Sequence, residues 1–410
     1  MNKITRLLAL VMALLMCMLP ALAETAPEDV LATVNGAAVT RAEYEKYLVQ
    51  LENTYYNYGY DVAVLKQLAL EMAVEYKLLD KMIADNGLEM TAEELADAAQ
   101  LAREDFYLQV DEIVAYYASY GLGDISTEEG YAALLLQVLA ELESMGVTEE
   151  SYIADVQESM AYRKAYDWIV RDVVVAEEDV RARYDELVEA DRVAYKNDVE
   201  GYEYMQQLNQ MYLAYGMADY YVDVYYVPAG YRLVTHILLE ADEAALDAYV
   251  AAKEAGDAEA LASAEQAVLA SVQPTVDEIN ARLAEGESFN DLILEYTTDT
   301  GMADAASIAS GYEVHPQSTM WVTEFRDASF TVDKVGDVTA PVVTDYGVHI
   351  IYYMADIGGA VAYTDDVRLL LEEELLYSLQ STCYSHKLAE LKAAAEIVYS
   401  EEAQALMSGY

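Results

Sequence analysis

The stretch DYGVHIIYY, residues 345–353, governs how the second half of this 410-residue chain folds. Its branched aliphatic and aromatic residues favour a β-strand, and Gly347 stands just before them. His349 lies in the middle of this apolar run and is one of only four histidines in the chain. A single buried histidine is more often a hydrogen-bonded core residue than a functional one, so the stretch by itself predicts structure alone.

A second histidine occurs in a similar setting. The segment YRLVTHILL, residues 231–239, also predicts a strand, and alternation places Val234, His236 and Leu238 on one face of it. If the two strands are neighbours in an antiparallel sheet, His236 and His349 meet on one otherwise apolar surface. Two histidines from distant parts of the chain, placed in this way, indicate a site. We expect a hydrogen-bonded histidine pair that forms a polar floor.

The N-terminus predicts export. A short basic start precedes the apolar run 7–19, which is too short to span a bilayer comfortably, and small residues follow it. This pattern is typical of a cleavable signal peptide over residues 1–23, cut after Ala23. Met16 stands where a lipoprotein signal would have a small residue before Cys17, so release is favoured over a lipid anchor. We expect an extracytoplasmic protein, in the cell envelope or secreted.

Composition narrows the function classes. The net charge of −51 would repel nucleic acid and anionic membrane surfaces, and no second long apolar run follows the signal peptide. We therefore expect no nucleic-acid partner and no stable membrane insertion. After cleavage Cys383 would be the remaining cysteine, so no internal disulfide could form and the core must stabilise the protein.

The first part of the mature chain is predicted to be helical. Residues 30–34 and 37–39 should form two short strands around the turn Asn35-Gly36. A capping box of Thr40 and Glu43 then begins a helix, and residues 60–172 continue in helical periodicity. Two further capping boxes are predicted, at Thr91 with Glu94 and at Ser126 with Glu129.

The end of the chain should return to this part. Residues 366–397 predict one long helix that ends in EIVYS, residues 396–400. A two-stranded hairpin is marginal alone, so we expect EIVYS to pair with the strands near residue 30. The helical domain would then be discontinuous. Between its parts, the stretch 202–227 is rich in tyrosine, which suits either packing between helices or contact with exposed chains.

Residues 231–355 predict an α+β domain. Strands stand at its two ends, and the acid-rich segment 240–273 predicts a pair of helices. Thr275 with Glu278 predicts the start of a further helix, and Ser288 with Asp291 another. The stretch TTDTGMADAAS, residues 297–307, is expected to be a loop.

Four spaced motifs in this region resemble the parvulin-type (PpiC, or rotamase) peptidyl-prolyl isomerases. They are HILL at 236–239, GESFNDLILEYTTD at 286–299, TEFRDASF at 323–330 and GDVTAPVVTDYGVHII at 336–351. The earlier stretch VNGAAVTRAEY, residues 34–44, resembles the chaperone domain of exported SurA/PrsA-like foldases. The resemblance implies a multidomain protein, with a mainly α-helical chaperone domain and an α+β parvulin domain built on an antiparallel sheet. The implied division is 24–230, 231–357 and a returning segment 358–410.

The resemblance also implies roles for individual residues. His236 and His349 match the paired histidines of the parvulin floor, and Asp299 matches the cysteine or aspartate beside the substrate peptide bond. The implied substrate-binding residues are Met320 or Trp321 at the usual methionine position, Phe325 and Phe330 as walls of a proline pocket, and Thr344 and Tyr346 before the G-x-H motif. No metal and no cofactor is implied.

Two departures from the family pattern stand out. The glycine-rich stretch of the family is reduced to ASGYEV around Gly311, which bears on whether the pocket is active. The acidic segment 240–273 replaces a shorter loop, and we expect it to decorate the fold away from the site.

The first hypothesis is therefore an exported foldase that isomerises X–Pro bonds in unfolded or partly folded exported proteins and also acts as a chaperone. The second is a holdase whose isomerase domain only binds. A metal-dependent enzyme with two histidines and a carboxylate is a third alternative, and a serine hydrolase is disfavoured because no G-x-S-x-G elbow is present.

A homodimer is one option for the assembly. His315 is expected in a loop, and His386 on the solvent face of the last helix.

Overall fold

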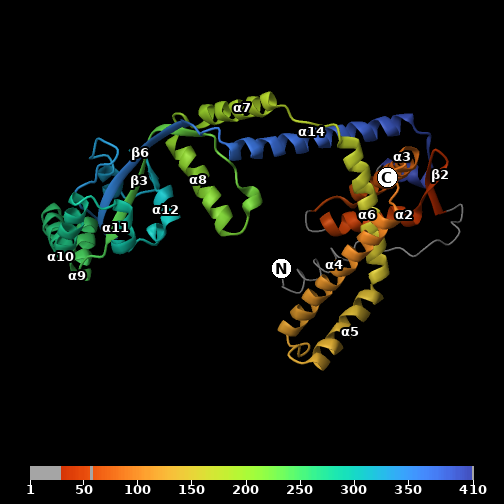
Figure 1. Ribbon diagram of the computed structural model, residues 1–410, viewed down its shortest axis with the longest axis horizontal. Helices are drawn as coiled ribbons and strands as arrows, with labels where there is room; N and C mark the ends of the chain where they lie inside the picture. Colours follow the sequence, from red (N-terminus) through yellow and green to blue (C-terminus); the bar gives the residue numbers. More distant parts are fainter. Residues whose placement is uncertain (1–28, 56–58, 409–410) are drawn as a thin grey trace. The chain divides into compact units, whose positions relative to one another are not determined.

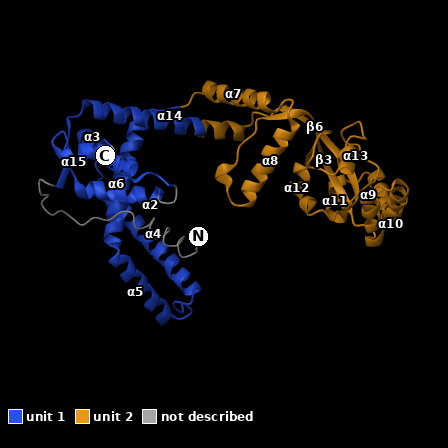
Figure 2. Cartoon of the chain, turned by 180° about the vertical axis from the view of Figure 1, so that it is seen from behind, with its two compact units in different colours: residues 1–174, 374–410 blue, residues 175–373 orange. Residues whose placement is uncertain are grey.

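The computed structural model describes residues 29–55 and 59–408, so the predicted signal peptide lies outside the described residues. The chain divides into two compact units (Figure 1, Figure 2). Unit 1 comprises Met1–Val174 and Glu374–Tyr410, and unit 2 comprises Val175–Glu373. The sequence placed 175–230 with the first domain and 358–373 with the last, whereas the contacts join both segments to unit 2.

Unit 1 is helical with one small sheet. Its elements are β1 (Val30–Val34), β2 (Ala37–Thr40), α2 (Arg41–Tyr55), α3 (Val62–Asn86), α4 (Ala92–Ser119), α5 (Glu128–Ser144), α6 (Glu149–Val170), the greater part of α14 (Asp365–Ala394), β7 (Ile397–Tyr399) and α15 (Glu401–Met407). No helix in the described ranges is both long and apolar enough to cross a bilayer.

The predicted return of the chain end is confirmed. The sheet has the order β2-β1-β7, and β7 pairs antiparallel with β1, Ala32 lying opposite Tyr399. The turn that joins β1 to β2 has Asn35 at φ 51° and Gly36 at φ 85°, the left-handed conformations that a tight hairpin needs. The first two strands and the last strand of the described residues therefore contribute to one core.

One predicted helix start in unit 1 is wrong. The capping box of Thr91 and Glu94 is present at the start of α4. At α5, however, Thr127 is the N-cap, and its hydroxyl accepts the backbone N–H of Gly130 at 3.1 Å. Ser126 instead donates to the carboxylate of Asp124 at 2.6 Å, a local bond that competes with capping.

Unit 2 has a four-stranded sheet with helices around it, so the predicted α+β class is confirmed. Its elements are α7 (Glu177–Tyr195), α8 (Val199–Ala214), η3 (Ala218–Tyr220), β3 (Tyr226–Leu239), α9 (Glu243–Ala255), α10 (Ala258–Ala284), α11 (Phe289–Tyr296), η4 (Thr300–Met302), α12 (Ala305–Ser310), β4 (Tyr312–Val314), α13 (Thr323–Ala328), β5 (Val342–Thr344), β6 (Gly347–Ala360) and the first residues of α14.

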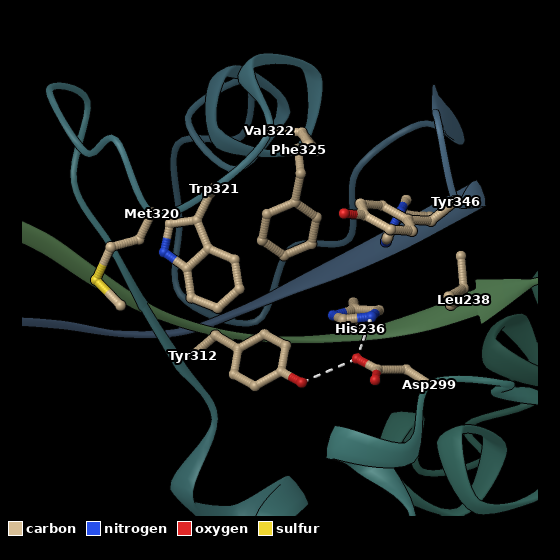
Figure 3. Close-up of a pocket in the computed structure, with 10 residues that line it drawn as sticks. His236, Leu238, Asp299, Tyr312, Met320, Trp321, Val322, Phe325 and Tyr346 are labelled. Carbon is tan, nitrogen blue, oxygen red and sulfur yellow. Dashed lines mark hydrogen bonds and ion pairs between the residues drawn. The ribbon is translucent and has the colours of Figure 1, made fainter. Parts of the chain in front are cut away.

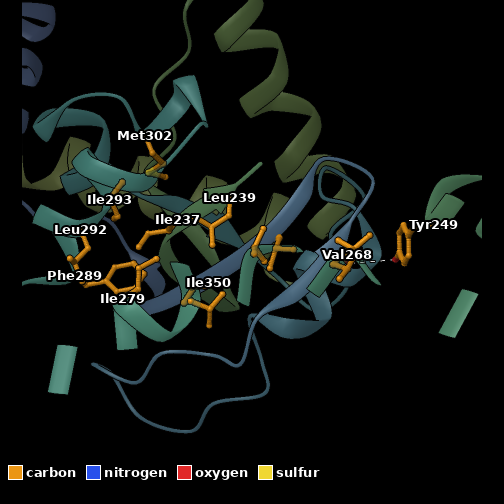
Figure 4. Packing of buried hydrophobic residues seen from close by; sticks show 14 of the residues in the cluster. Ile237, Leu239, Tyr249, Val268, Ile279, Phe289, Leu292, Ile293, Met302 and Ile350 are labelled. Atoms are coloured by element: carbon orange, nitrogen blue, oxygen red, sulfur yellow. Dashed lines mark hydrogen bonds between the residues drawn. The ribbon is translucent and has the colours of Figure 1, made fainter. Parts of the chain in front are cut away.

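The sheet of unit 2 has the order β4-β3-β6-β5, and all its pairs are antiparallel. Alternation along β3 and β6 gives it two apolar faces. On one face, Ile237 and Ile350 join the main core, which α10 and α11 cover (Figure 4). On the other face, Val234 and Ile351 pack against Phe325 of α13. His236 and His349 belong to this second face.

One predicted helix start in the middle of unit 2 is wrong. No new helix begins at Thr275, because α10 continues through Pro274. Proline removes a helical hydrogen bond and crowds the preceding turn, but Val268, Val272 and Val276 are buried against the core on both sides of it. Tertiary packing thus holds the helix together.

The stretch 297–307 is more ordered than the expected loop. It contains the short helix η4 and the start of α12. Asp299 caps η4 by accepting the N–H of Gly301 at 2.8 Å, and Asp304 accepts the N–H groups of Ala306 and Ser307. Short polar side chains at N-cap positions account for both turns.

Candidate active site

The two strand histidines come together as predicted. In the register of β3 and β6, His236 lies opposite Ile351 and His349 lies opposite Leu238, so the histidines are diagonal neighbours on one face. Their ring centroids are 5.0 Å apart. Both side chains are buried, at 2% and 6% exposure. Gly347, the first residue of β6, has φ 135°, and a Cβ there would meet the carbonyl oxygen of Leu239 at 2.5 Å, so glycine is required where β3 and β6 approach each other closely.

His349 is held by Thr344. Its Nε2 lies 2.9 Å from Oγ1 of Thr344, and that oxygen also accepts the backbone N–H of Tyr346 at 3.1 Å. Burial is the main cause that lowers the pKa of His349 to about 3, and the nearby His236 acts in the same direction. His349 is therefore a neutral imidazole at pH 7.

His236 faces Asp299 instead of bonding to the other histidine. Its Nε2 lies 3.1 Å from Oδ2 of Asp299, although the ring N–H does not point along a hydrogen bond to that oxygen. Among the described residues, the Nδ1 atoms of both histidines have no hydrogen-bond partner. The two histidines do not bond to each other, because Nε2 of His349 lies against Thr344 and Nε2 of His236 lies against Asp299.

Asp299 is an ionised carboxylate. The contact with His236 lowers its pKa well below the ordinary range, in opposition to partial burial, and two hydrogen bonds add to the effect. The donors are the N–H of Gly301 at 2.8 Å and the hydroxyl of Tyr312 at 2.9 Å. Hydrogen bonds to the charged form of a carboxyl group favour that form.

Tyr312 is a site residue that sequence reasoning missed. It belongs to the ASGYEV stretch, which departs from the family pattern, and it follows Gly311 at the start of β4. Its ring lies 4.7 Å from that of Trp321, and its hydroxyl reaches Asp299. No sequence signal linked Tyr312 to the site, because the resemblance fails at that point.

These groups form the floor of a cavity of about 330 Å³ (Figure 3). Met320 and Trp321 both line it, so the ambiguity between them resolves into two neighbouring wall residues. Trp321 and Phe325 lie with ring centroids 5.6 Å apart, and Phe325 lies 5.2 Å from His349. The full lining is His236, Leu238, Asp299, Tyr312, Met320, Trp321, Val322, Phe325, Tyr346 and His349.

Comparison with known proteins agrees with this geometry. The Rotamase family, described as the PPIC-type PPIase domain, matches residues 236–355. The chain contains a PPIC-type PPIase domain. The match begins at the first floor histidine, His236, and includes the second, His349.

Two relatives of this chain carry the name foldase protein PrsA. It is 33% identical over 130 residues to the foldase protein PrsA of Caldanaerobacter subterraneus, which covers 32% of this chain and 40% of that protein. It is 37% identical over 84 residues to the foldase protein PrsA of Geobacillus kaustophilus, or 20% and 28% of the two chains. The chain thus spans less than half the length of these curated relatives. The solved structure of PrsA from Bacillus subtilis is 19% identical, with 93% of this chain and 99% of that chain covered, at a TM-score of 0.21.

Two predicted substrate-binding residues of the PPIC-type domain do not line the cavity. Thr344 is fully buried and reaches the site through His349. Phe330 packs beside the cavity in the cluster that contains Phe325, and the guanidinium of Arg232 lies 4.7 Å from its ring centroid. Neither side chain is placed to touch a proline ring directly.

The remaining histidines lie outside the cavity. His315 is in the loop after β4, as expected, but it is buried and packs 4.9 Å from the ring of Tyr231. His386 is exposed on α14, as predicted. Across residues 29–55 and 59–408, no group of histidine, cysteine and acidic side chains is arranged to hold a metal ion.

Proposed function

We propose that this protein is an exported foldase whose PPIC-type domain isomerises X–Pro peptide bonds in unfolded or partly folded exported proteins. The observation that carries the proposal is the pairing of an aromatic cavity with a floor of one neutral histidine and one ionised carboxylate. His236, Asp299 and His349 would act in the isomerisation. Met320, Trp321, Phe325 and Tyr346 would contact the substrate, with Thr344 and Phe330 in support.

The isomerisation depends mainly on how the site positions the X–Pro peptide bond. Rotation about the X–Pro bond has a barrier of roughly 18–20 kcal/mol, which arises from double-bond character in the amide. No covalent bond needs to break, so the site must bind the twisted amide better than the planar one. Trp321 and Phe325 can hold the proline ring while the preceding carbonyl rotates, and exclusion of water disfavours the charge-separated planar form.

The floor can act without proton transfer. A neutral His349 offers no charge to the planar amide, and the ionised Asp299 keeps a fixed negative charge beside His236. Preorganised charges and dipoles act more strongly in a site that excludes water. The carboxylate would therefore favour one orientation of the rotating carbonyl, whose oxygen it repels.

Exposed tyrosines support a chaperone role in addition. After α8 the chain returns alongside it, because the side-chain amide of Asn209 donates to the carbonyl of Val222 and accepts its N–H, at 2.8 and 3.0 Å. Large exposed side chains gather on this arm: Tyr204, Met211, Leu213, Tyr215, Met217 and Tyr220. Such a surface suits contact with the apolar and aromatic residues of unfolded chains. The predicted signal peptide supports an extracytoplasmic location for this activity.

A protease-coupled assay on a short proline peptide tests the isomerase. The full chain should accelerate the cis-to-trans step, and His349→Ala should remove most of the acceleration. His386→Ala is the matched control, because His386 is exposed and far from the cavity in sequence. A rate at the uncatalysed background for the unaltered protein would reject the isomerase and favour the holdase.

A further inference from the structure

The acidic segment 240–273 contains one basic residue, Lys253. It lies in the last turn of α9, and its ammonium group contacts two carboxylates. Nζ is 2.9 Å from Oε1 of Glu324 and 2.7 Å from Oδ1 of Asp345. These acids belong to segments that are separate in the sequence, so a single cation joins α9 to both.

Both carboxylates stand next to residues of the cavity. Glu324 precedes Phe325 on α13, and Asp345 lies between Thr344 and Tyr346 in the turn from β5 to β6. Phe325 and Tyr346 line the cavity, and Thr344 bonds to His349. No residue of segment 240–273 lines the cavity itself, but Lys253 of this segment contacts two residues that flank its lining.

About one turn before Lys253, Tyr249 fixes α9 to the core of unit 2. Tyr249 is buried in the main core, and its hydroxyl donates to the carbonyl of Val343 in β5 at 3.4 Å. The ammonium of Lys253 lies 5.9 Å from the same ring. Since Tyr249 anchors the helix, Lys253 can hold α13 and the β5–β6 turn against a rigid support.

The charges explain why this lysine matters. The second oxygen of Glu324, Oε2, is buried and has no hydrogen-bond partner among the described residues. All three side chains are partly shielded from water, at 32% exposure for Lys253, 26% for Glu324 and 38% for Asp345. Without the ammonium group, two partly shielded carboxylates that now share it would be left close together, and like charges repel.

We propose that Lys253 is a positioning residue that holds two walls of the cavity, the α13 wall and the Tyr346 turn, at the separation a proline ring requires. The proposal deepens the isomerase function and, for its effect on rate, rests on it. The segment 240–273 then belongs to the site. Its role is to supply the support and the one cation that joins the walls.

The test compares four variants of the full chain. Lys253→Met removes the cation and leaves both acids. Lys253→Arg keeps the charge. The triple variant Lys253→Met/Glu324→Gln/Asp345→Asn removes the repulsion together with the cation. Arg282→Met is the matched control, since Arg282 also pairs with two carboxylates of unit 2, Glu287 and Glu295, and none of the three borders a lining residue.

Steady-state kinetics separate positioning from loss of folded protein. Lys253→Met should lower kcat/KM by about tenfold, mainly through a higher KM, since a small displacement of binding groups has effects of this size. Partial unfolding would instead lower kcat and leave KM unchanged. In Lys253→Arg and in the triple variant, kcat/KM should lie close to the value of the unaltered protein. Arg282→Met should keep the KM of the unaltered protein.

A second readout needs no substrate. In a Trp168→Phe background, Trp321 is the remaining tryptophan and reports on the cavity wall. Acrylamide should quench its fluorescence more strongly in Lys253→Met than in Arg282→Met. If the protein lacks isomerase activity but this difference appears, the proposed function fails and the positioning role stands. Equal quenching in Lys253→Met and Arg282→Met overturns the positioning role, whatever the activity.

Discussion

His236 and Asp299 meet at 3.1 Å on the floor of the cavity, where a buried imidazole from a central strand faces a carboxylate from the loop after α11. The contact keeps Asp299 ionised and turns His236 away from a direct bond to His349. The floor thus consists of an ionised carboxylate in contact with one buried imidazole, His236, beside a second imidazole, His349, that is neutral. Predictions about pH and about the neighbouring side chains follow from this arrangement.

Tyr312→Phe tests the support of the carboxylate. The variant keeps the ring against Trp321 and removes one hydrogen bond to Asp299, so the pKa of Asp299 should rise toward its ordinary value. The acid limb of the kcat/KM profile should then move to higher pH, and kcat/KM at pH 7 should fall by about two- to tenfold, the equivalent of one hydrogen bond. Tyr296→Phe, which loses a bond to Glu278 outside the cavity, should leave the profile unchanged.

His349 should make the folded state sensitive to acid. Its folded pKa of about 3 lies below the ordinary value of 6.5. Between these two values the unfolded state binds a proton that the folded state does not, so stability falls as the pH falls. Between pH 6.5 and pH 3, His349 should lower the free energy of unfolding by about 1.4 kcal/mol for each unit by which the pH falls.

Urea unfolding between pH 7 and pH 4 measures this slope. His349→Gln should show a shallower loss of stability than the unaltered protein, and His386→Gln should show the same loss. An identical slope in His349→Gln would mean that His349 already carries a proton in the folded state.

Gly311 tests the altered loop before β4. It has φ 62° and ψ −173°, and an added Cβ would meet the carbonyl oxygen of Val234 at 2.8 Å and the sulfur of Met354 at 2.9 Å. Gly311→Ala should cost about 1–3 kcal/mol of unfolding free energy from backbone strain alone, and the clash adds to this. It should also weaken peptide binding, because Tyr312 follows directly.

Gly256→Ala is the control for backbone strain. Gly256 ends α9 at φ 67° with no atom within 4 Å of an added Cβ, so the expected cost is about 1 kcal/mol. If the two substitutions have equal effects on stability and on peptide binding, the close approach at Gly311 is not important.

The tyrosine-rich arm, formed by α8 and the segment that follows it, should bind unfolded chains and should not take part in the isomerisation of short peptides. Tyr204, Tyr215 and Tyr220 are 61%, 75% and 61% exposed. Their joint replacement by serine should reduce the suppression of aggregation of an unfolded test protein and leave isomerisation of a short proline peptide unchanged. Tyr377→Ser, at an exposed tyrosine of α14, is the control. Unchanged suppression in the triple variant would exclude the arm as a contact surface.

Much of this fold could be predicted from local patterns. Alternation in two apolar strands places His236 and His349 on one face, and the marginal stability of a lone hairpin predicts the return of β7 to β1. These inferences depend on periodicity and on short-range physics, which a sequence displays directly. The motif resemblance added Asp299 and the aromatic walls.

Side-chain partners could not be predicted in the same way. The continuity of α10 across Pro274 depends on valines that pack against a distant core. The bond from Tyr312 to Asp299 and the contacts of Lys253 join segments whose proximity exists only in the folded chain. At Gly311 and in segment 240–273 the sequence departs from the family pattern. No local sequence signal predicts the contacts of these two regions.

Exchange spectroscopy by NMR on a short proline peptide, at neutral pH and without a protease, measures the isomerase directly. A catalytic amount of the full chain should produce exchange cross-peaks between the cis and trans proline signals. Uncatalysed isomerisation takes tens to hundreds of seconds, too slow to give such peaks. They should weaken strongly with Asp299→Asn and persist with His386→Ala. Peptide that binds, as shown by quenching of Trp321 in the Trp168→Phe background, without any exchange cross-peak would contradict the account and leave a holdase.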